Sequence, residues 1–336
     1  MPTAILSSRT STYKPALAAF AAIGSGWVFV LVTLGAFTTS IGAGMAFPDW
    51  PLSHGSINPE GWLQDLAMFA EHSHRLTGMV MGFVTIGLAL WLWAREERPW
   101  LRSLGGWAVV IVIFQGILGG KRVTLDAIAV PGFEMSLGQM LRIPHGILAH
   151  IFVCILIAVA VACSRSWIRQ SVPVGDKLRR VGIACCLLVL LQLVIAATMR
   201  HNGAGLAIHT FPFSTPDNHW LPATWDFRVG IHFAHRVMAV VLTVALIWFA
   251  ILVHRDRGAP AALRAAATTL VVLLTAQIIL GAQIIWTFRK SDVTTAHVVV
   301  GAMTLAVTFW ITWVAHRDQL ERTAAPLPAR HTPVVA

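Results

Sequence analysis

Charged side chains are scarce in this chain. Asp, Glu, Lys and Arg together make up 12% of its 336 residues, whereas an ordinary soluble domain carries about 25%. Hydrophobic residues account for 56%, and the mean hydropathy is +0.70. These values exclude an ordinary soluble protein. Apolar runs of about 20 residues, each long enough to cross a bilayer, also exclude a disordered, collagenous or disulfide-stapled chain. We therefore expect a polytopic membrane protein.

Cysteines are few, and none lies in a loop where an oxidising compartment would pair it. A disulfide framework is therefore not expected, and no Cys-x-x-Cys metal motif is present. The first apolar run is too long for a signal peptide and lacks a convincing cleavage site, so we expect a retained first helix. The cysteines are Cys154, Cys163, Cys185 and Cys186.

Eight apolar segments reach the length of a membrane-spanning helix. No ten-residue alternation suggests a barrel, and backbone groups inside a bilayer must pair within their own segment, so we predict α-helices. The predicted helices cover about 17–41, 73–94, 104–123, 143–163, 181–199, 231–253, 265–288 and 295–315.

Most of the Lys and Arg residues lie in the two tails and in alternate loops. The positive-inside rule then places both termini in the cytoplasm and the long loops 42–70 and 201–229 outside. The net charge of +10 thus reflects membrane topology, and we expect no nucleic-acid partner. The outer loops are also rich in tryptophan, which suits a lid over a hydrophobic ligand, although an aromatic belt explains it almost as well. These tryptophans are Trp50, Trp62, Trp220 and Trp225.

The two halves of the chain repeat each other. The segment 42–51 matches 203–212 at an offset of 161 residues, and the same offset carries His74-Arg75 onto His235-Arg236. A second echo relates 115–119 to 277–281. The fold class is therefore all-α: a polytopic membrane protein with eight transmembrane helices in two pseudo-symmetric, parallel four-helix bundles. The predicted divisions are an N-terminal cytoplasmic tail (1–16), a first bundle (17–163), a cytoplasmic linker (164–180), a second bundle (181–315) and a C-terminal cytoplasmic tail (316–336).

Four of the 14 histidines recur at the predicted outer ends of the even-numbered helices: His74, His145, His235 and His297. Imidazole is the usual protein ligand of haem iron, and two facing histidines can hold a porphyrin inside a four-helix bundle. A lone histidine at a membrane interface is more often just a polar interfacial residue. Recurrence in both halves, beside small residues, favours ligands. We predict one haem site per half.

Neighbouring histidines leave the choice of ligand open within three of these positions. The alternatives are His72 for His74, His150 for His145, and His232 for His235. The repeat alignment favours His74 and His235, and the depth along the helix favours His145. The other histidines fall in predicted loops, helix ends or tails, where solvated positions are expected: His54, His201, His209, His219, His254, His316 and His331.

Only the first half carries an acid near its candidate ligand. Glu71 lies three residues before His74, on the same helical face, and aligns with His232 of the second half. A carboxylate there could act on a bound substrate, while a helix cap or an ion pair with Arg75 explains it equally well. Arg75 and Arg236 are candidates for haem propionate contacts, with snorkelling interfacial arginines as the alternative.

Together these residues resemble the haem A synthase family over about residues 17 to 315. The motifs that carry the resemblance are Glu71-His72-Ser73-His74-Arg75 (the family's Glu-x-x-His-Arg), the segment 44–51, the segment 145–149, the segment 231–236 and the segment 297–302. Some bacterial members carry a cysteine pair in the first outer loop. This chain has none there, so it resembles a non-cysteine subtype and a thiol-based role is excluded.

The resemblance implies an oxidoreductase of the cytoplasmic (inner) cell membrane that converts the C8 methyl group of haem O to a formyl group by successive hydroxylations, making haem A for terminal cytochrome oxidases. It implies that His74 and His145 hold the substrate haem, and that Glu71 is the catalytic glutamate. His235 and His297 would hold a haem b cofactor. Implied partners are haem O, a haem O synthase, an electron donor and membrane lipid, with a homo-oligomer left open.

Two other functions compete with this one. A di-haem b-type transmembrane electron carrier would use both histidine pairs and would not need Glu71. A solute transporter is disfavoured, because the parallel halves show neither broken helices nor charges near the membrane midplane.

Overall fold

The computed structural model describes residues 11–323, so most of both predicted tails, including His331, lies outside the described residues. Eight helices of 25 to 30 residues are long and apolar enough to span a membrane, which confirms the predicted number. At 1.5 Å per residue each is about 40 Å long, more than the roughly 30 Å of a bilayer core. They are α1 (Pro15–Ser40), α2 (Leu66–Arg95), α3 (Pro99–Thr124), α4 (Leu137–Cys163), α6 (Asp176–His201), α7 (Phe227–Arg255), α8 (Ala261–Trp286) and α9 (Ser291–Ala315).

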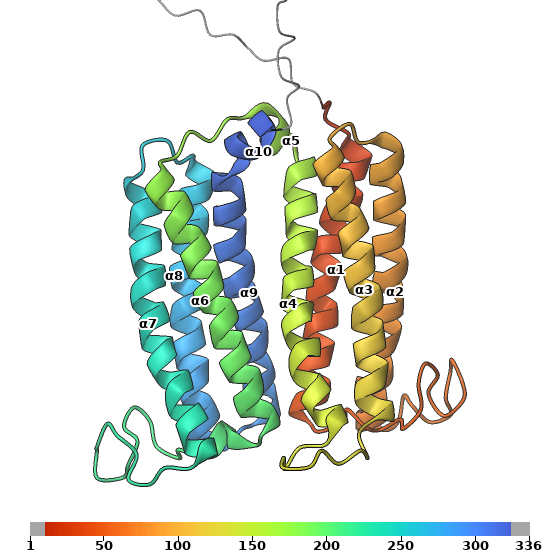
Figure 1. Ribbon diagram of the computed structural model, residues 1–336, viewed down its shortest axis with the longest axis vertical. Coiled ribbons are helices and arrows are strands. Elements are labelled where there is room, and N and C mark those ends of the chain that lie inside the picture. The colour runs from red at the N-terminus through yellow and green to blue at the C-terminus, as the bar shows by residue number, and fades with distance from the viewer. Residues whose placement is uncertain (1–10, 324–336) are drawn as a thin grey trace, which may run out of the picture.

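Short helices complete the secondary structure. They are α5 (Arg165–Arg169), the 3-10 helix η1 (Ala204–Leu206) and α10 (Arg317–Thr323). Between residues 11 and 323 no strand is formed, and the all-α fold class is confirmed. The two long loops lie at one end of the helices, whereas α5 and α10 lie at the opposite end (Figure 1).

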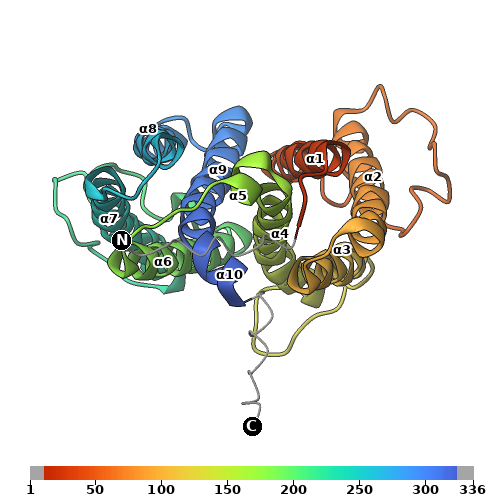
Figure 2. The same cartoon turned by 90° about the horizontal axis from the view of Figure 1, so that it is seen from above.

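The helices stand in two groups of four, α1–α4 and α6–α9 (Figure 1). Within each group, consecutive helices pack together and the first packs against the last. Helices α4 and α9 meet at the centre, as the view along the helices shows (Figure 2). In addition, α1 contacts α9 and α6 contacts α4. This reciprocal pattern is the arrangement expected of two parallel copies.

All eight membrane-spanning helices begin before the residues predicted from hydropathy, and α2 differs most. Helix α2 begins at Leu66 rather than near 73, where Asp65 caps it by accepting a hydrogen bond from the Met68 N–H at 2.8 Å. Helix α7 begins at Phe227 rather than near 231, behind the cap Asp226. In α2 the polar segment 71–75 separates the apolar first turn from the long apolar run, so hydropathy alone places the start too late. The outer loops are correspondingly shorter, about 41–65 and 202–226, and the candidate histidines lie inside their helices rather than at the ends.

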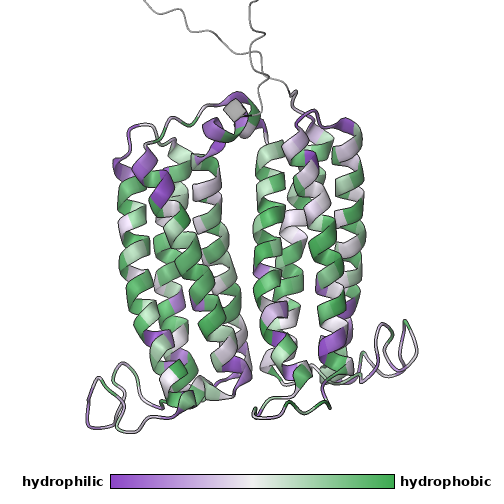
Figure 3. Cartoon of the chain, viewed as in Figure 1, coloured by the Kyte–Doolittle hydropathy of each residue, from purple (hydrophilic) through white to green (hydrophobic). Residues whose placement is uncertain are grey.

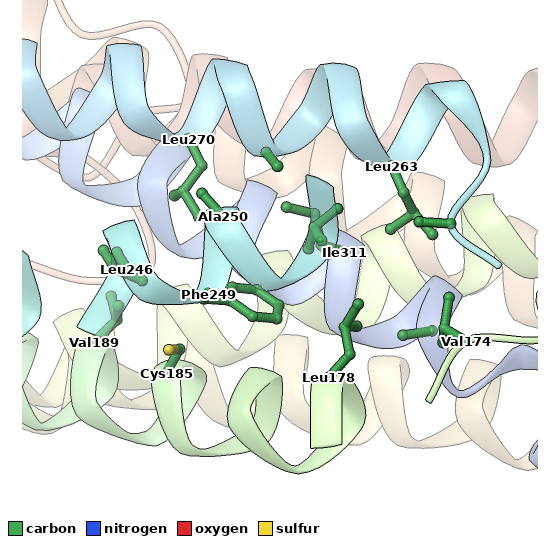
Figure 4. Packing of buried hydrophobic residues seen from close by; sticks show 14 of the residues in the cluster. Val174, Leu178, Cys185, Val189, Leu246, Phe249, Ala250, Leu263, Leu270 and Ile311 are labelled. Atoms are coloured by element: carbon green, nitrogen blue, oxygen red, sulfur yellow. The ribbon is translucent and has the colours of Figure 1, made fainter. Parts of the chain in front are cut away.

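The two large clusters of buried hydrophobic residues lie mainly in the part of each bundle that is nearer α5 and α10. Hydrophobic residues cover most of each helix (Figure 3), and the buried cluster of the second half joins Cys185, Leu246, Phe249 and Leu270 (Figure 4). Further along α4, by contrast, no residue in the segment 139–151 is buried, and none is in the segment 291–301 of α9. The candidate histidines of both helices fall in these loosely packed segments.

An ion-pair network ties the two halves together at the α10 end. The Arg98 side chain is 1% exposed and donates to both carboxylate oxygens of Glu96, at 2.8 and 3.1 Å. It also donates to Glu321 of α10 at 3.0 Å, and Glu321 accepts a hydrogen bond from the Trp167 indole at 2.6 Å. Because α10 follows the last helix of the second half, this network joins that half to the first.

This network predicts a pH-dependent contribution to stability. Burial would raise the pKa of Glu96, but the hydrogen bonds and charge of Arg98 outweigh it and hold the pKa below the ordinary value of 4.5. A carboxylate with a lowered pKa stabilises the fold above its unfolded-state pKa, and this contribution is lost as the pH falls through the folded-state pKa. Breaking a buried pair costs about 3–5 kcal/mol. We therefore expect Glu96→Gln to lower the melting temperature at pH 7, and the deficit to shrink below about pH 4.5.

The neighbouring Glu97 provides the control, because its side chain is 47% exposed in its pair with Lys14. Glu97→Gln should cost about 1 kcal/mol or less. Thermal unfolding of both variants in detergent, followed by circular dichroism from pH 7 to pH 3, makes the comparison. A Glu96→Gln deficit that stays constant over this range would contradict the prediction.

Candidate functional site

The two candidate histidines of each half lie on helices that face each other across the bundle. In the first half, α2 and α4 each pack against α1 and α3; in the second, α7 and α9 each pack against α6 and α8. His74 of α2 and His145 of α4 lie close enough to interact electrostatically, and so do His235 of α7 and His297 of α9; we call such pairs electrostatic neighbours. The structure thus brings together both of the pairs predicted from the sequence.

Glycines lie directly against the imidazole rings of the first half. A Cβ atom added at Gly35 of α1 would be 2.7 Å from Cε1 of His74, and one added at Gly119 of α3 would be 3.2 Å from Cε1 of His145. Nδ1 of His74 is 3.2 Å from the Leu31 carbonyl oxygen. With the Nδ1 proton donated to that carbonyl, Nε2 of His74 keeps its lone pair for a metal.

The second half repeats this arrangement with two exchanges, the first being Ala196 at the position that corresponds to Gly35. An added Cβ at Gly281 would lie 3.3 Å from Cε1 of His297, and Gly281 corresponds to Gly119 in the sequence echo. The Gln192 side chain replaces a backbone carbonyl beside His235: its Nε2 is 3.1 Å from Nδ1 and donates to the His235 carbonyl oxygen at 3.0 Å.

A pair of repeat-related glutamines holds the remaining histidines. Gln115 donates from Nε2 to the His145 carbonyl oxygen at 3.0 Å, and Nε2 of Gln277 is 3.2 Å from Nε2 of His297. Nδ1 of His145 and of His297 is buried without a hydrogen-bond partner. In the sequence, this echo indicated only a duplication. The signal for the role of these residues was a glutamine followed four residues later by a glycine in an apolar run. Nothing in the sequence pointed to Gln192.

The alternative ligands His72 and His150 make other contacts. His72 is buried beneath the first outer loop, with Nδ1 3.0 Å from the Ser53 hydroxyl and the Trp62 ring edge-on at 4.8 Å between centroids. Nδ1 of His150 is 2.7 Å from the Gly146 carbonyl oxygen of its own helix.

Glu71 is fully buried and forms an ion pair. Its Oε1 accepts a hydrogen bond from Arg75 Nη2 at 2.7 Å, and its Oε2 accepts one from the Phe47 N–H at 3.1 Å. The explanation of Glu71 as a helix cap is wrong, because α2 begins at Leu66 behind the cap Asp65. The ion pair, the other local explanation, is present.

Arg75 fastens the first outer loop to α2. Its guanidinium donates to three loop carbonyl oxygens, those of Phe47 at 3.0 Å, Asp49 at 2.8 Å and Leu52 at 2.7 Å. We call this arrangement of Glu71, Arg75 and the loop carbonyls the loop latch. It closes the loop over the outer end of the bundle.

The second half has the same latch with a different acceptor. Arg236 donates to the carbonyl oxygens of Ile208 at 3.3 Å and Thr210 at 2.7 Å. His232 takes the place of Glu71: its Nδ1 is 3.3 Å from the Ile208 backbone N and its Nε2 is 3.3 Å from Arg236 Nε. A neutral imidazole has one lone-pair nitrogen, so His232 accepts one of these two hydrogen bonds. These contacts follow those of the first half at the same offset of 161 residues. The repeat has therefore kept the latch and exchanged a carboxylate for an imidazole.

The outer-loop tryptophans pack on the helix ends. Trp50 lies so close to α3 that a Cβ at Gly120 would be 2.3 Å from its ring, and Trp62 stacks on Phe69 of α2. In the second half Trp225 packs edge-on against Phe233 of α7. The loops thus cover the outer ends of the bundles, although their action as a lid stays a prediction.

These features define a class: a multi-pass helical membrane protein of two similar four-helix halves, each with a histidine pair across its interior. A family model for cytochrome oxidase assembly proteins, COX15-CtaA, matches residues 18–309. The chain belongs to this family, and the resemblance found in the sequence is confirmed.

Several curated relatives carry the name heme A synthase. The protein of Shouchella clausii is 25% identical over 266 residues, 79% of this chain and 85% of the relative. That of Alkalihalophilus pseudofirmus is 23% identical over 301 residues, 89% of this chain and 97% of the relative. That of Rhodopseudomonas palustris is 28% identical over 274 residues, 76% of this chain and 69% of the relative.

Proposed function

We propose that the protein is a haem A synthase, an oxidoreductase that converts the C8 methyl group of haem O to a formyl group by successive hydroxylations. Family membership and the names of its relatives support an enzyme of haem A biosynthesis. The product would supply terminal cytochrome oxidases. Orientation follows from the distribution of basic residues, with both termini in the cytoplasm and the latched loops outside the inner membrane.

One difference between the halves supports the assignment of different roles to them. The two latches are alike except that the first holds a buried carboxylate, Glu71, where the second holds His232. A permanent electron carrier has no use for a carboxylate in one half alone. We therefore assign substrate oxidation to the first half, where Glu71 would stabilise positive charge on the substrate or move protons during oxidation of the methyl group.

The residues of both halves fit a haem. His74 and His145 would ligate the iron of the substrate haem O, and His235 and His297 that of a haem b, which supplies one-electron transfer when bound. The unpartnered Nδ1 atoms, the glycines against the rings and the loose packing of α4 and α9 around their histidines all suit a flat ligand between the pairs. The contacts of His72 and His150 with other groups support His74 and His145 as the ligands.

The close contact of Gly35 with His74 gives a test of the first site. Gly35→Ala would force the imidazole to move, since the new Cβ would lie 2.7 Å from Cε1. A displaced ligand loses its alignment with the iron, so we expect haem O binding to weaken at least about tenfold, or 1.4 kcal/mol. Binding is measured by optical titration of the purified protein.

Gly26 in the same helix is the matched control, because an added Cβ there meets nothing within 4 Å. Gly26→Ala should bind haem O as the wild type does and gain about 1 kcal/mol of helix stability. Equal binding by both variants would contradict the placement of His74 at the iron.

Pigment analysis tests the function directly. The full-length protein is co-expressed with a haem O synthase, its haems are extracted with acid acetone, and they are identified by chromatography and mass. Haem O, its hydroxylated form or haem A beside haem b is the expected result. Haem b alone, with haem O available in the membrane, would favour the di-haem electron carrier and refute the proposal.

A further inference from the structure

One arginine near the first histidine pair has no acidic partner. Arg122 lies at the outer end of α3 and is half-buried. Its Nη1 donates to the Gly44 carbonyl oxygen at 3.1 Å. Within residues 11–323 it forms no ion pair with any carboxylate. An added Cβ at Gly44 would lie 2.9 Å from the same nitrogen, so the first outer loop passes directly over this guanidinium.

The surrounding charges do not balance. Arg75 is paired with Glu71 at 2.7 Å, and Arg142 is paired with Asp126, also at 2.7 Å. All four of these groups are electrostatic neighbours of Arg122. Three guanidinium groups therefore share two carboxylates, and one positive charge is left over. A partly buried charge without a counter-ion is costly, so the site is suited to an anion.

A histidine of the second half adds to this cluster. His201, expected in a solvated loop, instead ends α6 and is half-buried, with Arg122 and Arg142 as electrostatic neighbours. His201 brings no carboxylate, so the excess positive charge of the three arginines over the two acids stays uncompensated. Both halves thus contribute to an electropositive region at the outer end of the first bundle.

The arginines predicted to bind propionates are already engaged. Arg75 donates to three loop carbonyls and to Glu71, and Arg236 donates to loop carbonyls and to His232. Either would have to release its loop to bind another acceptor. Arg122 can bind another acceptor without releasing the loop, because within residues 11–323 it donates a single hydrogen bond, to the Gly44 carbonyl oxygen.

Arg122 also lies where a porphyrin edge would be. Helix α3 packs against both α2 and α4, and Arg122 is an electrostatic neighbour of both His74 and His145. A porphyrin ligated by His74 and His145 would lie between α2 and α4, next to the helix α3 that carries Arg122.

We propose that Arg122 binds a propionate carboxylate of the porphyrin held in the first half, with Arg142 and His201 beside it. The inference rests on the proposed function, because it takes the first-half ligand to be haem O. Arg75 and Arg236 keep the loops closed, and the carboxylate of the ligand supplies the counter-ion that the chain lacks.

The test compares haem O with its propionate dimethyl ester, which has the same macrocycle and no carboxylates. Both are titrated optically into the full-length protein purified with its resident haem. Wild type should bind the free acid about 10- to 100-fold more tightly than the ester, the range for hydrogen bonds to charged groups. Arg122→Gln should lose most of this preference while binding the ester unchanged. Arg122→Lys, which keeps the charge, should retain part of it.

Arg102→Gln is the control, since Arg102 lies at the opposite end of the same helix and should leave both affinities unchanged. Retained resident haem shows that a variant is folded. If Arg122→Gln preserves the preference for the free acid, or weakens acid and ester equally, the proposal is overturned. If His74→Ala binds haem O as tightly as the wild type does, the proposed function itself fails. That result is distinct from an Arg122→Gln variant that binds haem O and its ester as the wild type does.

Discussion

Glu71→His is expected to abolish the oxidation of haem O while leaving the fold and haem binding intact. The chain itself shows that a histidine is compatible with the latch, because His232 lies 3.3 Å from both Arg236 Nε and a loop backbone N in the second half and can accept a hydrogen bond from one of them. The variant therefore keeps an acceptor for Arg75 and removes only the carboxylate. General acid or base groups contribute about 10²–10⁴-fold to rates, so we expect haem A formation to fall at least about 100-fold.

Two further variants separate a chemical role of Glu71 from a structural one. Glu71→Ala leaves Arg75 partly buried without its acid, so it should also destabilise the protein, by about 3–5 kcal/mol. His232→Glu places a carboxylate in the second latch and should leave haem A formation unchanged. Haem A is measured in membranes from cells that make haem O. Normal haem A production by a folded Glu71→His variant would remove the carboxylate from the mechanism.

The sequence predicted the fold class and the histidine pairs because both depend on signals repeated along the chain. Eight apolar runs require eight spanning helices whatever their exact ends. His74 and His235 are separated by the same 161 residues as the rest of the repeat, and this relation is visible only when the two halves are compared. Helix starts were less predictable, since the caps Asp65 and Asp226 have no hydropathy signal and the polar segment 71–75 interrupts the apolar run of α2.

The environment of the site could not be predicted from the sequence, because it depends on contacts between distant segments. Position alone gave Glu71 three explanations, and the helix cap is rejected because α2 begins behind the cap Asp65. The contact of Glu71 with the Phe47 N–H joins segments 24 residues apart. Arg75 and Arg236 are arginines at the membrane rim by sequence, and only the folded loops show which carbonyls engage them. The sequence did not identify Arg122 as a site residue, because an arginine can be recognised as unpaired only when every neighbouring acid has been located in the fold.

The resident haem is expected to depend on the second half alone. Removing an axial imidazole leaves the iron without one of its two protein ligands, so His235→Ala or His297→Ala should purify with little or no haem b. His74→Ala and His145→Ala should keep haem b and lose the binding of haem O. The absorbance of the Soret band per protein, before and after addition of haem O, measures both sites in the same sample.

His150→Ala controls for the loss of a histidine from α4, since His150 contacts the Gly146 carbonyl of its own helix; it should retain both haems. The reverse result, with haem b lost from His74→Ala and kept by His235→Ala, would exchange the roles of the halves. It would also place Glu71 beside the permanent haem rather than the substrate. The carboxylate and the substrate must share one half if Glu71 acts in the oxidation, so this experiment and the Glu71→His variant have to agree.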